Sequence, residues 1–578
     1  MRAVSTGPIR IVAASRRGLA RLSGTLGVLP REFLALGGIV LVAAFMRLVN
    51  LPVRGGWDSD QGTEMLGLRS ALASGRIPTF GPEAISVTSS FHHGALYYDL
   101  LLPAAWLGNG DPTWVVAEIA LLSLIVVPIV WWIARCIGGA AAGLSAALVA
   151  ATSASLISYA TFIWNPTLVE PGAAIAFLGA WQAVRSGRPF WWAVSAAGAA
   201  VAVQSHIAAA VIVLPLAVTF LIDLRRGPAA RRRKVAAWGL AGVALFVVTY
   251  LPLIVYELGH DFSDTRGMLA YFSDPNSASS AALPLRVLFA MIRILAWPLT
   301  RWPIVEFKPA FSLAFLIASA VIVGLVWRLG AAGRRAPQEE GASDAPTSTP
   351  AVAPELERAP ATTPAPATTP APTVERFGTR LIAFWLLLII LALGIGLHAV
   401  SEVQAEELPT EQYHVVADAL VFVAVGLIAG GLWRKLPRRW PTIARRVTAV
   451  AAVAALVTWN AGHLPALTSP DGGWPAGQAA ATRLERDAAS SPMALVPLFE
   501  QKGSDAYLYP LTRDGLALVA PDKAVTVVLL CDTYWLKVSC DTADGEWLTA
   551  NPAGGVATRI DRFTAAPNRI LTVYRRTP

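Results

Sequence analysis

Long apolar runs separated by short polar segments dominate the chain from Phe33 to about position 461. Most runs approach about 20 residues, the length at which an α-helix crosses the hydrocarbon core of a bilayer. The pattern therefore predicts about eleven membrane-spanning helices. Their expected ranges are 33–52, 114–133, 139–163, 166–184, 190–204, 207–224, 235–256, 310–327, 381–400, 415–433 and 447–461.

Basic residues at the ends of these runs predict their orientation. Residues 1–32 contain six arginines and a single acid, Glu32, and basic clusters recur at alternate ends of the later runs. Because cytoplasmic loops are enriched in Lys and Arg, the N-terminus and these clusters are expected in the cytoplasm. Large outer loops are then expected at 54–113 and 257–308. Arg47, inside the first run, is expected to extend its guanidinium outward to the interface.

Two apolar stretches within the outer loops are interpreted as helices that do not cross the membrane. Counting Phe91 to Leu107 as a span would invert every later loop and place the basic clusters outside. We therefore expect an amphipathic or re-entrant outer helix there. Leu283–Leu299 is expected to be a second amphipathic helix of this kind.

Two further segments differ in composition from the apolar runs. Residues 331–376 are rich in Ala, Pro and Thr and predict a disordered cytoplasmic linker between a module at 33–330 and C-terminal transmembrane helices at 377–462. Residues 463–578 predict a small α/β domain, which the odd number of spans places outside. Its expected strands are Ala494–Leu498, Ala524–Cys531 and Arg569–Val573, with a charged helical stretch at Thr482–Ala489.

The three cysteines add one expectation about this domain. Cys531 and Cys540 flank an aromatic, strand-like run at Thr533–Leu536, and from the sequence they could be free thiols or a disulfide. The expected export of the domain favours the disulfide. Cys136 lies at the end of a span and is expected to be inert.

Composition supports the membrane class and narrows the partners. The 578 residues are 55% hydrophobic and only 15% charged, with a mean hydropathy of +0.53, whereas soluble proteins carry about 25% charged residues. The net charge of +9 suggests nucleic acid until the basic residues are located. They lie mainly in short loops between apolar runs, so no nucleic-acid partner is expected. The predicted fold class is mainly α, a polytopic membrane protein with a small extracytoplasmic α/β domain.

Polar residues gather in the expected outer loops, and only these residues could share one site. Asp58 and Asp60 directly follow the first span. The other candidates are His92, His93, Tyr97, Tyr98, Trp164, Asn165, His206, Gln412, Tyr413 and His414. Each also has a structural interpretation: a solvated loop, an interfacial aromatic belt, a helix start at proline or a hydrated helix end. Because all of these residues are expected on the same side of the membrane, a shared functional site is favoured over separate structural roles.

This set of groups suits sugar transfer from a lipid-linked donor. The donor phosphate is a good leaving group, while the acceptor needs a carboxylate to take its proton, a role that Asp60 fits. The phosphate needs cationic or hydrogen-bonding groups at headgroup depth, which the other outer loops could supply. Asp58 and Asp60 could also bind a divalent cation, although two carboxylates alone are a weak metal signal. No cofactor is otherwise indicated.

Three short motifs in these loops resemble a known family. Asp60-Gln61 after the first span looks like the Asp-Glu or Asp-Gly element of GT-C glycosyltransferases. Gly81-Pro82 followed by His93-Gly94-Ala95-Leu96-Tyr97-Tyr98 is similar to the Gly-Pro-Leu-Tyr-Tyr pattern of bacterial family-39-like members, the protein-mannosyltransferase-like and aminoarabinose-transferase-like enzymes. Trp164-Asn165-Pro166 resembles their second outer-loop motif. The likeness covers roughly residues 33–430.

The resemblance implies a GT-C-like bundle and a specific activity. It implies inverting transfer of a sugar from a polyprenyl-phosphate donor to an extracytoplasmic glycan, lipid or protein, with Asp60 as the catalytic carboxylate and Asp58 in support. Asn165 stands where oligosaccharyltransferases have a second acidic motif, which weighs against a metal-dependent mechanism of their kind. Gln412-Tyr413 stands where related enzymes often have Arg-Tyr, which leaves the partner of the phosphate open.

Two other functions remain as alternatives. A glycolipid transporter or flippase predicts ionisable residues inside the spans, and the apolar runs contain few of them. A non-enzymatic envelope-assembly protein predicts that the outer-loop residues tolerate substitution. A glycosyltransferase of a bacterial cytoplasmic membrane is the leading hypothesis, with its N-terminus cytoplasmic and its C-terminal domain extracytoplasmic.

Overall fold

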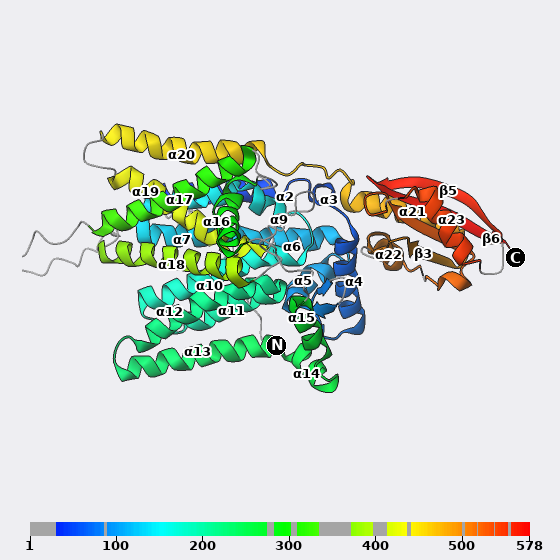
Figure 1. The fold of residues 1–578 in the computed structure, drawn as a ribbon, viewed down its shortest axis with the longest axis horizontal. Helices are drawn as coiled ribbons and strands as arrows, with labels where there is room; N and C mark the ends of the chain where they lie inside the picture. Colours follow the sequence, from blue (N-terminus) through cyan, green and yellow to red (C-terminus); the bar gives the residue numbers. More distant parts are fainter. Residues whose placement is uncertain are drawn as a thin grey trace, which may run out of the picture.

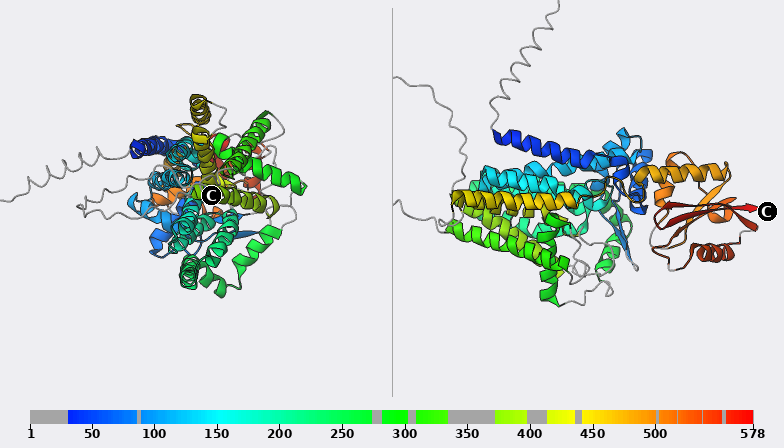
Figure 2. Two further views of the ribbon diagram at one scale, coloured as in Figure 1. Left: turned by 90° about the vertical axis from the view of Figure 1, so that its left-hand side faces the viewer. Right: turned by 90° about the horizontal axis from the view of Figure 1, so that it is seen from above.

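The structure, a computed structural model, places a helical bundle beside a small α/β domain (Figure 1). It describes residues 31–85, 89–273, 282–301, 309–333, 372–396, 413–435, 441–499, 503–516, 518–536, 538–552 and 556–577. Most helices of the bundle run along the long axis, and the α/β domain continues that axis at one end (Figures 1 and 2). We call this the domain end of the bundle and the other the opposite end.

The bundle confirms the predicted polytopic, mainly α fold, since each predicted span contains a helix. Its helices are α2 (Arg31–Leu48), α6 (Pro112–Leu124), α7 (Val126–Gly138), α8 (Ala140–Thr152), α9 (Ala154–Tyr159), α10 (Val169–Ser186), α11 (Trp191–Ser205), α12 (Val213–Arg225), α13 (Ala229–Thr249), α16 (Leu283–Thr300), α17 (Pro309–Gly333), α18 (Pro372–Gly396), α19 (Asp418–Lys435) and α20 (Thr442–Gly462). Among the described residues, seven helices are long and apolar enough to cross a membrane, or eight if α13 and α14 (Leu251–Gly259) form one bent span. The chain is therefore a multi-pass membrane protein.

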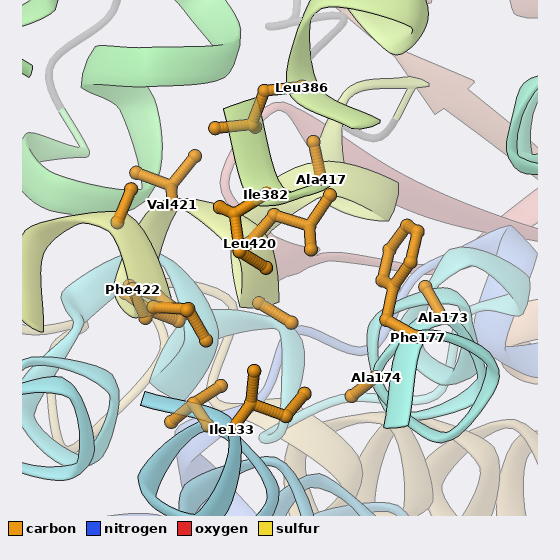
Figure 3. Close-up of a cluster of buried hydrophobic side chains, with 14 of the residues drawn as sticks. Ile133, Ala173, Ala174, Phe177, Ile382, Leu386, Ala417, Leu420, Val421 and Phe422 are labelled. Carbon is orange, nitrogen blue, oxygen red and sulfur yellow. The ribbon is translucent and has the colours of Figure 1, made fainter. Parts of the chain in front are cut away.

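The core of the bundle forms around α19, whose apolar side chains are almost all buried. Leu420, Val421 and Phe422 project among side chains of α7, α10 and α18, including Ile133 and Phe177 (Figure 3). Small residues let the backbones approach closely. A Cβ on Gly426 or Gly430 of α19 would collide with Ala142 of α8. Such small-residue contacts are typical of helix packing in membranes.

Several predicted spans are interrupted or redirected. The predicted 139–163 span breaks at Ser153, between α8 and α9. The predicted 235–256 span bends by 58° between α13 and α14. Helix α16, expected to be an amphipathic helix of an outer loop, is long and apolar enough to be a candidate span and is largely buried, and it runs across the bundle (Figures 1 and 2).

Three other expectations need correction. Phe91–Leu107 is not one helix, because Phe91 and His92 lie in strand β2 (Ser90–His92) and helix α5 begins only at Leu96 (Leu96–Leu107). Both ends of the expected linker 331–376 are helical, because α17 extends to Gly333 and α18 begins at Pro372; the residues between them lie outside the described part. Arg47 does not extend outward: its side chain is fully buried.

The C-terminal domain is a four-stranded mixed sheet with helices against it. The strand order is β3-β4-β6-β5, with β3 parallel to β4 and the other pairs antiparallel. The expected strands lie in β3 (Met493–Pro497), β4 (Thr526–Asp532) and β6 (Arg569–Thr577), whereas β5 (Val556–Ala566) was not expected and Thr533–Leu536 is not a strand. The helices are α21 (Gly473–Ala488), α22 (Asp505–Arg513) and α23 (Cys540–Ala550). A disulfide joins Cys531 to Cys540.

This domain shares a hydrophobic core with the domain end of the bundle. Trp57 and Met65 from the first outer loop are buried in the same cluster as Trp474, Tyr507 and Tyr509 from the C-terminal segment. The ring centroids of Trp57 and Trp474 are 4.6 Å apart. The two parts are therefore packed together rather than joined only by the chain.

Candidate functional site

Asp58, Asp60 and Gln61 lie at the start of α4 (Ser59–Ser74), and they have two different roles. Asp58 is the N-cap of α4 and forms a capping box with Gln61, whose side chain accepts from the Asp58 backbone N–H at 2.9 Å. Gln61 also donates through Nε2 to the Ile163 carbonyl at 2.8 Å. Such a box satisfies the unpaired N–H groups of a first turn and fixes where the helix starts. The position of Asp60 in that turn follows from it.

The C-terminal domain holds the same stretch from the other side. Arg569 on β6 pairs with Asp58, with 2.8 Å between Nη2 and Oδ2, and donates to the Trp57 carbonyl at 3.3 Å. The Trp57 backbone N–H donates to Asp471 at 2.7 Å, and its indole N–H donates to the Ala506 carbonyl at 2.6 Å. Asp58 therefore anchors the loop to the domain, and its carboxylate is engaged by Arg569.

Asp60 instead lies one helical turn before Glu64, on the same face of α4. Glu64 is buried, and burial raises the pKa of its carboxyl to about 8, opposed by a hydrogen bond with Tyr98 and reinforced by the nearby charge of Asp60. Burial likewise raises the pKa of Tyr97 and of Tyr98, with the charge of Glu64 adding to the effect. At neutral pH Asp60 therefore lies near a protonated acid, Glu64, which itself lies near the neutral phenols of Tyr97 and Tyr98.

The adjacent histidines have different partners: His92 is the last residue of β2, and His93 follows the strand. His92 pairs through Nδ1 with Asp264 of α15 (Ser263–Ser273) at 2.7 Å. His93 is buried and faces His206, with 5.4 Å between their rings. The structure therefore separates the two: His92 belongs to the contact with α15, and His93 to the interior.

His93, His206 and Tyr413 form an aromatic and polar group at the domain end. The Tyr413 ring lies 5.1 Å from that of His206. Burial lowers the pKa of His93 well below its usual range, assisted by His206 and His92, and lowers that of His206 to about 4. His206 Nδ1 accepts from the Ala208 N–H at 3.2 Å, which leaves Nε2 to carry the proton. Both imidazoles are neutral at physiological pH.

Close backbone packing explains the motif that precedes this group. The Gly81 N–H donates to the His93 carbonyl, and the His93 N–H donates to the Pro82 carbonyl, both at 2.9 Å. A Cβ on Gly81 would come within 2.1 Å of the Gly94 carbonyl oxygen, and one on Gly94 would strike the Gln204 side chain at 2.2 Å. Glycine at these two positions therefore lets the chain on either side of His93 pack closely against itself and against Gln204 at the end of α11.

Asn165 and Trp164 support the second outer turn rather than entering the group directly. Asn165 donates through Nδ2 to the Ser205 carbonyl at 2.9 Å, which ties its turn to the residue before His206. The Trp164 ring stacks with Tyr159 at 6.3 Å. Tyr413 and His414 precede α19, with His414 buried, whereas Gln412 lies outside the described residues.

Three ionisable residues are buried just inside the bundle at this end. Arg47 donates to Ser123 and to the Ala151 carbonyl, and it lies close enough to Glu170 to interact electrostatically. Glu170 interacts in turn with Asp418. Within the described part of the chain, neither Asp418 oxygen has a hydrogen-bond partner, nor does Glu170 Oε1. Both acids lie in the first turn of a helix, where the helix dipole favours negative charge.

The structure thus redistributes the predicted site residues. Asp60 lies near Glu64, which hydrogen-bonds with Tyr98, and His93 lies with His206 and Tyr413, while Asp58 and His92 make contacts elsewhere. Among the described residues, no three His, Cys, Asp or Glu side chains are arranged to hold a metal ion.

From the sequence, Glu64 and Gln204 were recognised as residues of the outer loops but were given no role, and Asp418 was missed. Glu64 had a readable signal, since it follows Asp60 by four residues, a spacing that places both side chains on one face if the segment is helical. The Asp58-x-x-Gln61 spacing likewise indicates a capping box. Asp418 and Gln204 offered no comparable local signal.

Comparison with known proteins supports the fold. No family model and no curated protein matches the sequence. The crystal structure of ArnT from Cupriavidus metallidurans in the apo state is similar, with a TM-score of 0.55 at 13% identity over 94% of this chain and 97% of that chain. The structure of ArnT bound to undecaprenyl phosphate has the same TM-score and coverage, at 14% identity. The apo oligosaccharyltransferase of Archaeoglobus fulgidus is more distant, with a TM-score of 0.44 at 13% identity over 85% of this chain and 60% of that chain. The chain therefore has a GT-C-like fold.

Proposed function

We propose that the protein is a membrane glycosyltransferase that transfers a sugar from a polyprenyl-phosphate donor to an acceptor at the domain end of the bundle. That end is expected to face outward from a bacterial cytoplasmic membrane, where the acceptor is a glycan, lipid or protein of the envelope. The fold supports this proposal, as does the undecaprenyl phosphate bound to ArnT, a protein of similar structure.

The observation that carries the proposal is the placement of Asp60. It lies in the first turn of a helix fixed by its own capping box and by Arg569, and next to the buried pair of Glu64 and Tyr98. Rigid placement of a carboxylate is what positioning of a reacting group requires. The neutral Glu64 adds no second negative charge to that face of α4.

The proposed step uses Asp60 as general base. The acceptor hydroxyl or amine gives its proton to the Asp60 carboxylate as its lone pair forms a bond to the anomeric carbon. The bond from that carbon to the phosphate oxygen breaks on the opposite face, and its electron pair leaves with the polyprenyl phosphate. Displacement from the opposite face inverts the anomeric configuration.

The phosphate of the donor is assigned to the group of His93, His206 and Tyr413. The imidazoles are neutral there, so they would bind the phosphate as hydrogen-bond donors rather than as cations. The approach of a phosphate would also favour their protonated forms, since a nearby opposite charge stabilises the charged state of an imidazole.

Asp60→Asn in detergent-solubilised membranes tests the base. With a panel of polyprenyl-phosphate sugars, we expect transfer to fall by roughly 10²- to 10⁴-fold, the usual contribution of a general base. Asp58→Asn, measured alongside, should cost less, because its carboxylate serves the cap and the pair with Arg569. Full transfer activity in a folded Asp60→Asn protein would contradict the assignment.

The buried residues Arg47, Glu170 and Asp418 favour one alternative, a glycolipid transporter or flippase. Ionisable residues inside spans often mark transport pathways. The two functions separate in proteoliposomes that contain a labelled glycolipid and no acceptor. Translocation that survives Asp60→Asn would support the transporter.

A further inference from the structure

A pocket at the opposite end of the bundle lies between the starts of α11 and α13. Its volume is about 480 Å³, and its lining includes Arg188, Phe190, Arg231, Lys234 and Trp238. Figure 1 places the α12–α13 turn at the end of the bundle away from the C-terminal domain. The groups discussed above lie at the other end, so this pocket is a separate feature.

One of the three cations of the lining is neutralised within the protein. Arg231 pairs with the buried carboxylate of Asp223, with 2.7 Å between Nη2 and Oδ1. The indole N–H of Trp192 donates to the other oxygen of Asp223 at 3.0 Å. These bonds fix Arg231 as part of the wall.

The other two cations face solvent. In the part of the chain that the structure describes, neither the Arg188 guanidinium nor the Lys234 ammonium makes a hydrogen bond or ion pair, and both residues are exposed. Helix α13 begins after Pro228 without a side-chain cap, and Ala230 of its first turn lines the pocket. First-turn N–H groups favour an anion, so they add to the positive charge.

The aromatic side of the pocket leads onto the apolar surface of α13. Phe190 and Trp238 meet at 6.4 Å in an edge-to-face arrangement, and Trp238 is 43% exposed. Leu245, seven residues after Trp238 and on the same face of the helix, is 40% exposed, and Leu240 and Val243 are 70% and 60% exposed on the neighbouring faces of α13. In a membrane protein such a surface faces lipid, and aromatic side chains between it and basic residues mark the headgroup level.

We propose that this pocket binds an anionic phospholipid, with the headgroup phosphate between Arg188 and Lys234 and the acyl chains against Trp238 and the outer face of α13. Guanidinium and ammonium groups both bind phosphate oxygens, the former through two parallel hydrogen bonds. A soluble phosphate would use only the cations. The continuity of the pocket with the exposed apolar face of α13 favours the lipid.

Native mass spectrometry of the full chain in neutral detergent can count bound lipids one at a time. We expect single adducts of phosphatidylglycerol and weaker adducts of phosphatidylcholine. The double variant Arg188→Gln/Lys234→Gln should bind phosphatidylglycerol about 30-fold more weakly, since each cation near an anionic lipid contributes about 1 kcal/mol and 1.4 kcal/mol is tenfold.

The same turn of the chain offers a matched control. Arg232 and Arg233 are exposed neighbours that do not line the pocket, so Arg232→Gln/Arg233→Gln should keep the affinity within about twofold, like other surface changes away from a site. Trp238→Ala should weaken the lipid adduct and leave binding of glycerol phosphate unchanged.

Three results would overturn the proposal. The first is an equal loss in both double variants, which would indicate diffuse attraction to the whole basic turn. The second is equal binding of phosphatidylcholine. The third is binding of glycerol phosphate as tight as that of the lipid, which would make the site one for a soluble phosphate. None depends on sugar transfer, so the test stands apart from the proposed function.

Discussion

The two ends of the bundle both bury ionisable side chains, but they treat them differently. At the opposite end, three buried or half-buried pairs each have 2.7 Å between their charged atoms: Arg135 with Glu32, Arg231 with Asp223, and Arg328 with Glu375. At the domain end, oxygens of Glu64, Glu170 and Asp418 are buried without a hydrogen-bond partner among the described residues.

The difference follows from what buried charge costs. A buried charge is tolerated when an opposite charge compensates its desolvation, and a group without such a partner changes its protonation instead. Incompletely satisfied buried acids are therefore unusual, and they gather at functional sites more often than elsewhere. The comparison indicates that the paired charges at the opposite end serve the structure, and it makes the incompletely satisfied acids at the domain end the candidates for the proposed reaction.

The largest effect on stability should come from substitution of Glu64, and its result can contradict the comparison between the two ends of the bundle. Burial raises the pKa of Glu64 to about 8 from 4.5. As pH rises from 4.5 to 8, the unfolded chain has lost a proton that the folded one retains, so stability falls and the penalty is complete above pH 8. We expect Glu64→Gln to match the wild type near pH 4 and to exceed its free energy of unfolding at pH 9 by on the order of 5 kcal/mol.

Unfolding monitored in detergent across this pH range provides the measurement. Glu83→Gln, which changes an exposed glutamate on β1 (Glu83–Ile85), is the control and should follow the wild type. If the difference in stability between Glu64→Gln and the wild type does not change with pH, the pKa of Glu64 is not raised, and the comparison between the two ends fails.

Breaking an ion pair at the opposite end should cost slightly less stability and should not change sugar transfer. Arg328→Met strands Glu375, whose side chain is 5% exposed, so we expect a loss of about 3 kcal/mol of stability. Transfer per folded molecule should be unchanged. Arg225→Met, at an exposed arginine of the same end, should cost less than about 0.5 kcal/mol. A loss of activity in the folded Arg328→Met protein would show that the reaction depends on residues at both ends of the bundle.

The smallest effect should come from Arg569, which connects the C-terminal domain to the site. Arg569→Ala removes the partner of Asp58 and loosens the start of α4, so we expect kcat to fall about tenfold, or roughly 1.4 kcal/mol, with KM little changed. Arg569→Lys should restore part of the rate. Arg575→Ala is the control, because Arg575 on the same strand donates to the Asp487 carbonyl within the domain. Equal kcat in Arg569→Ala and the wild type would show that docking is not needed for positioning.

Much of the fold was predictable because a bilayer restricts the backbone structures that can cross it. Backbone polar groups in hydrocarbon must be satisfied within the segment, so apolar runs of span length become helices. The break at Ser153 was not predictable. There Asn460 accepts from the Ala154 N–H at 2.8 Å and donates to the Leu299 carbonyl at 2.8 Å, which satisfies two helix ends that lie far away in sequence.

The candidate site could be proposed from the sequence as a set of residues but not as an arrangement. Polar side chains that gather in the expected outer loops marked Asp60, His93 and His206 as candidates. The separation of His92 from His93 depends on a short strand within a stretch expected to be helical. The role of Asp58 depends on Arg569, which lies 511 positions later in the chain.

The sequence by itself determined the membrane class, the identity of most helices, the strands β3, β4 and β6, and the loops from which a site could be built. These follow from local hydrophobicity and periodicity, which each segment carries alone. Only the tertiary structure decided which acids are buried, which are paired, and that Asp58 anchors the C-terminal domain while Asp60 lies beside Glu64. Burial and pairing are properties of two segments in contact, and no single segment encodes its partner.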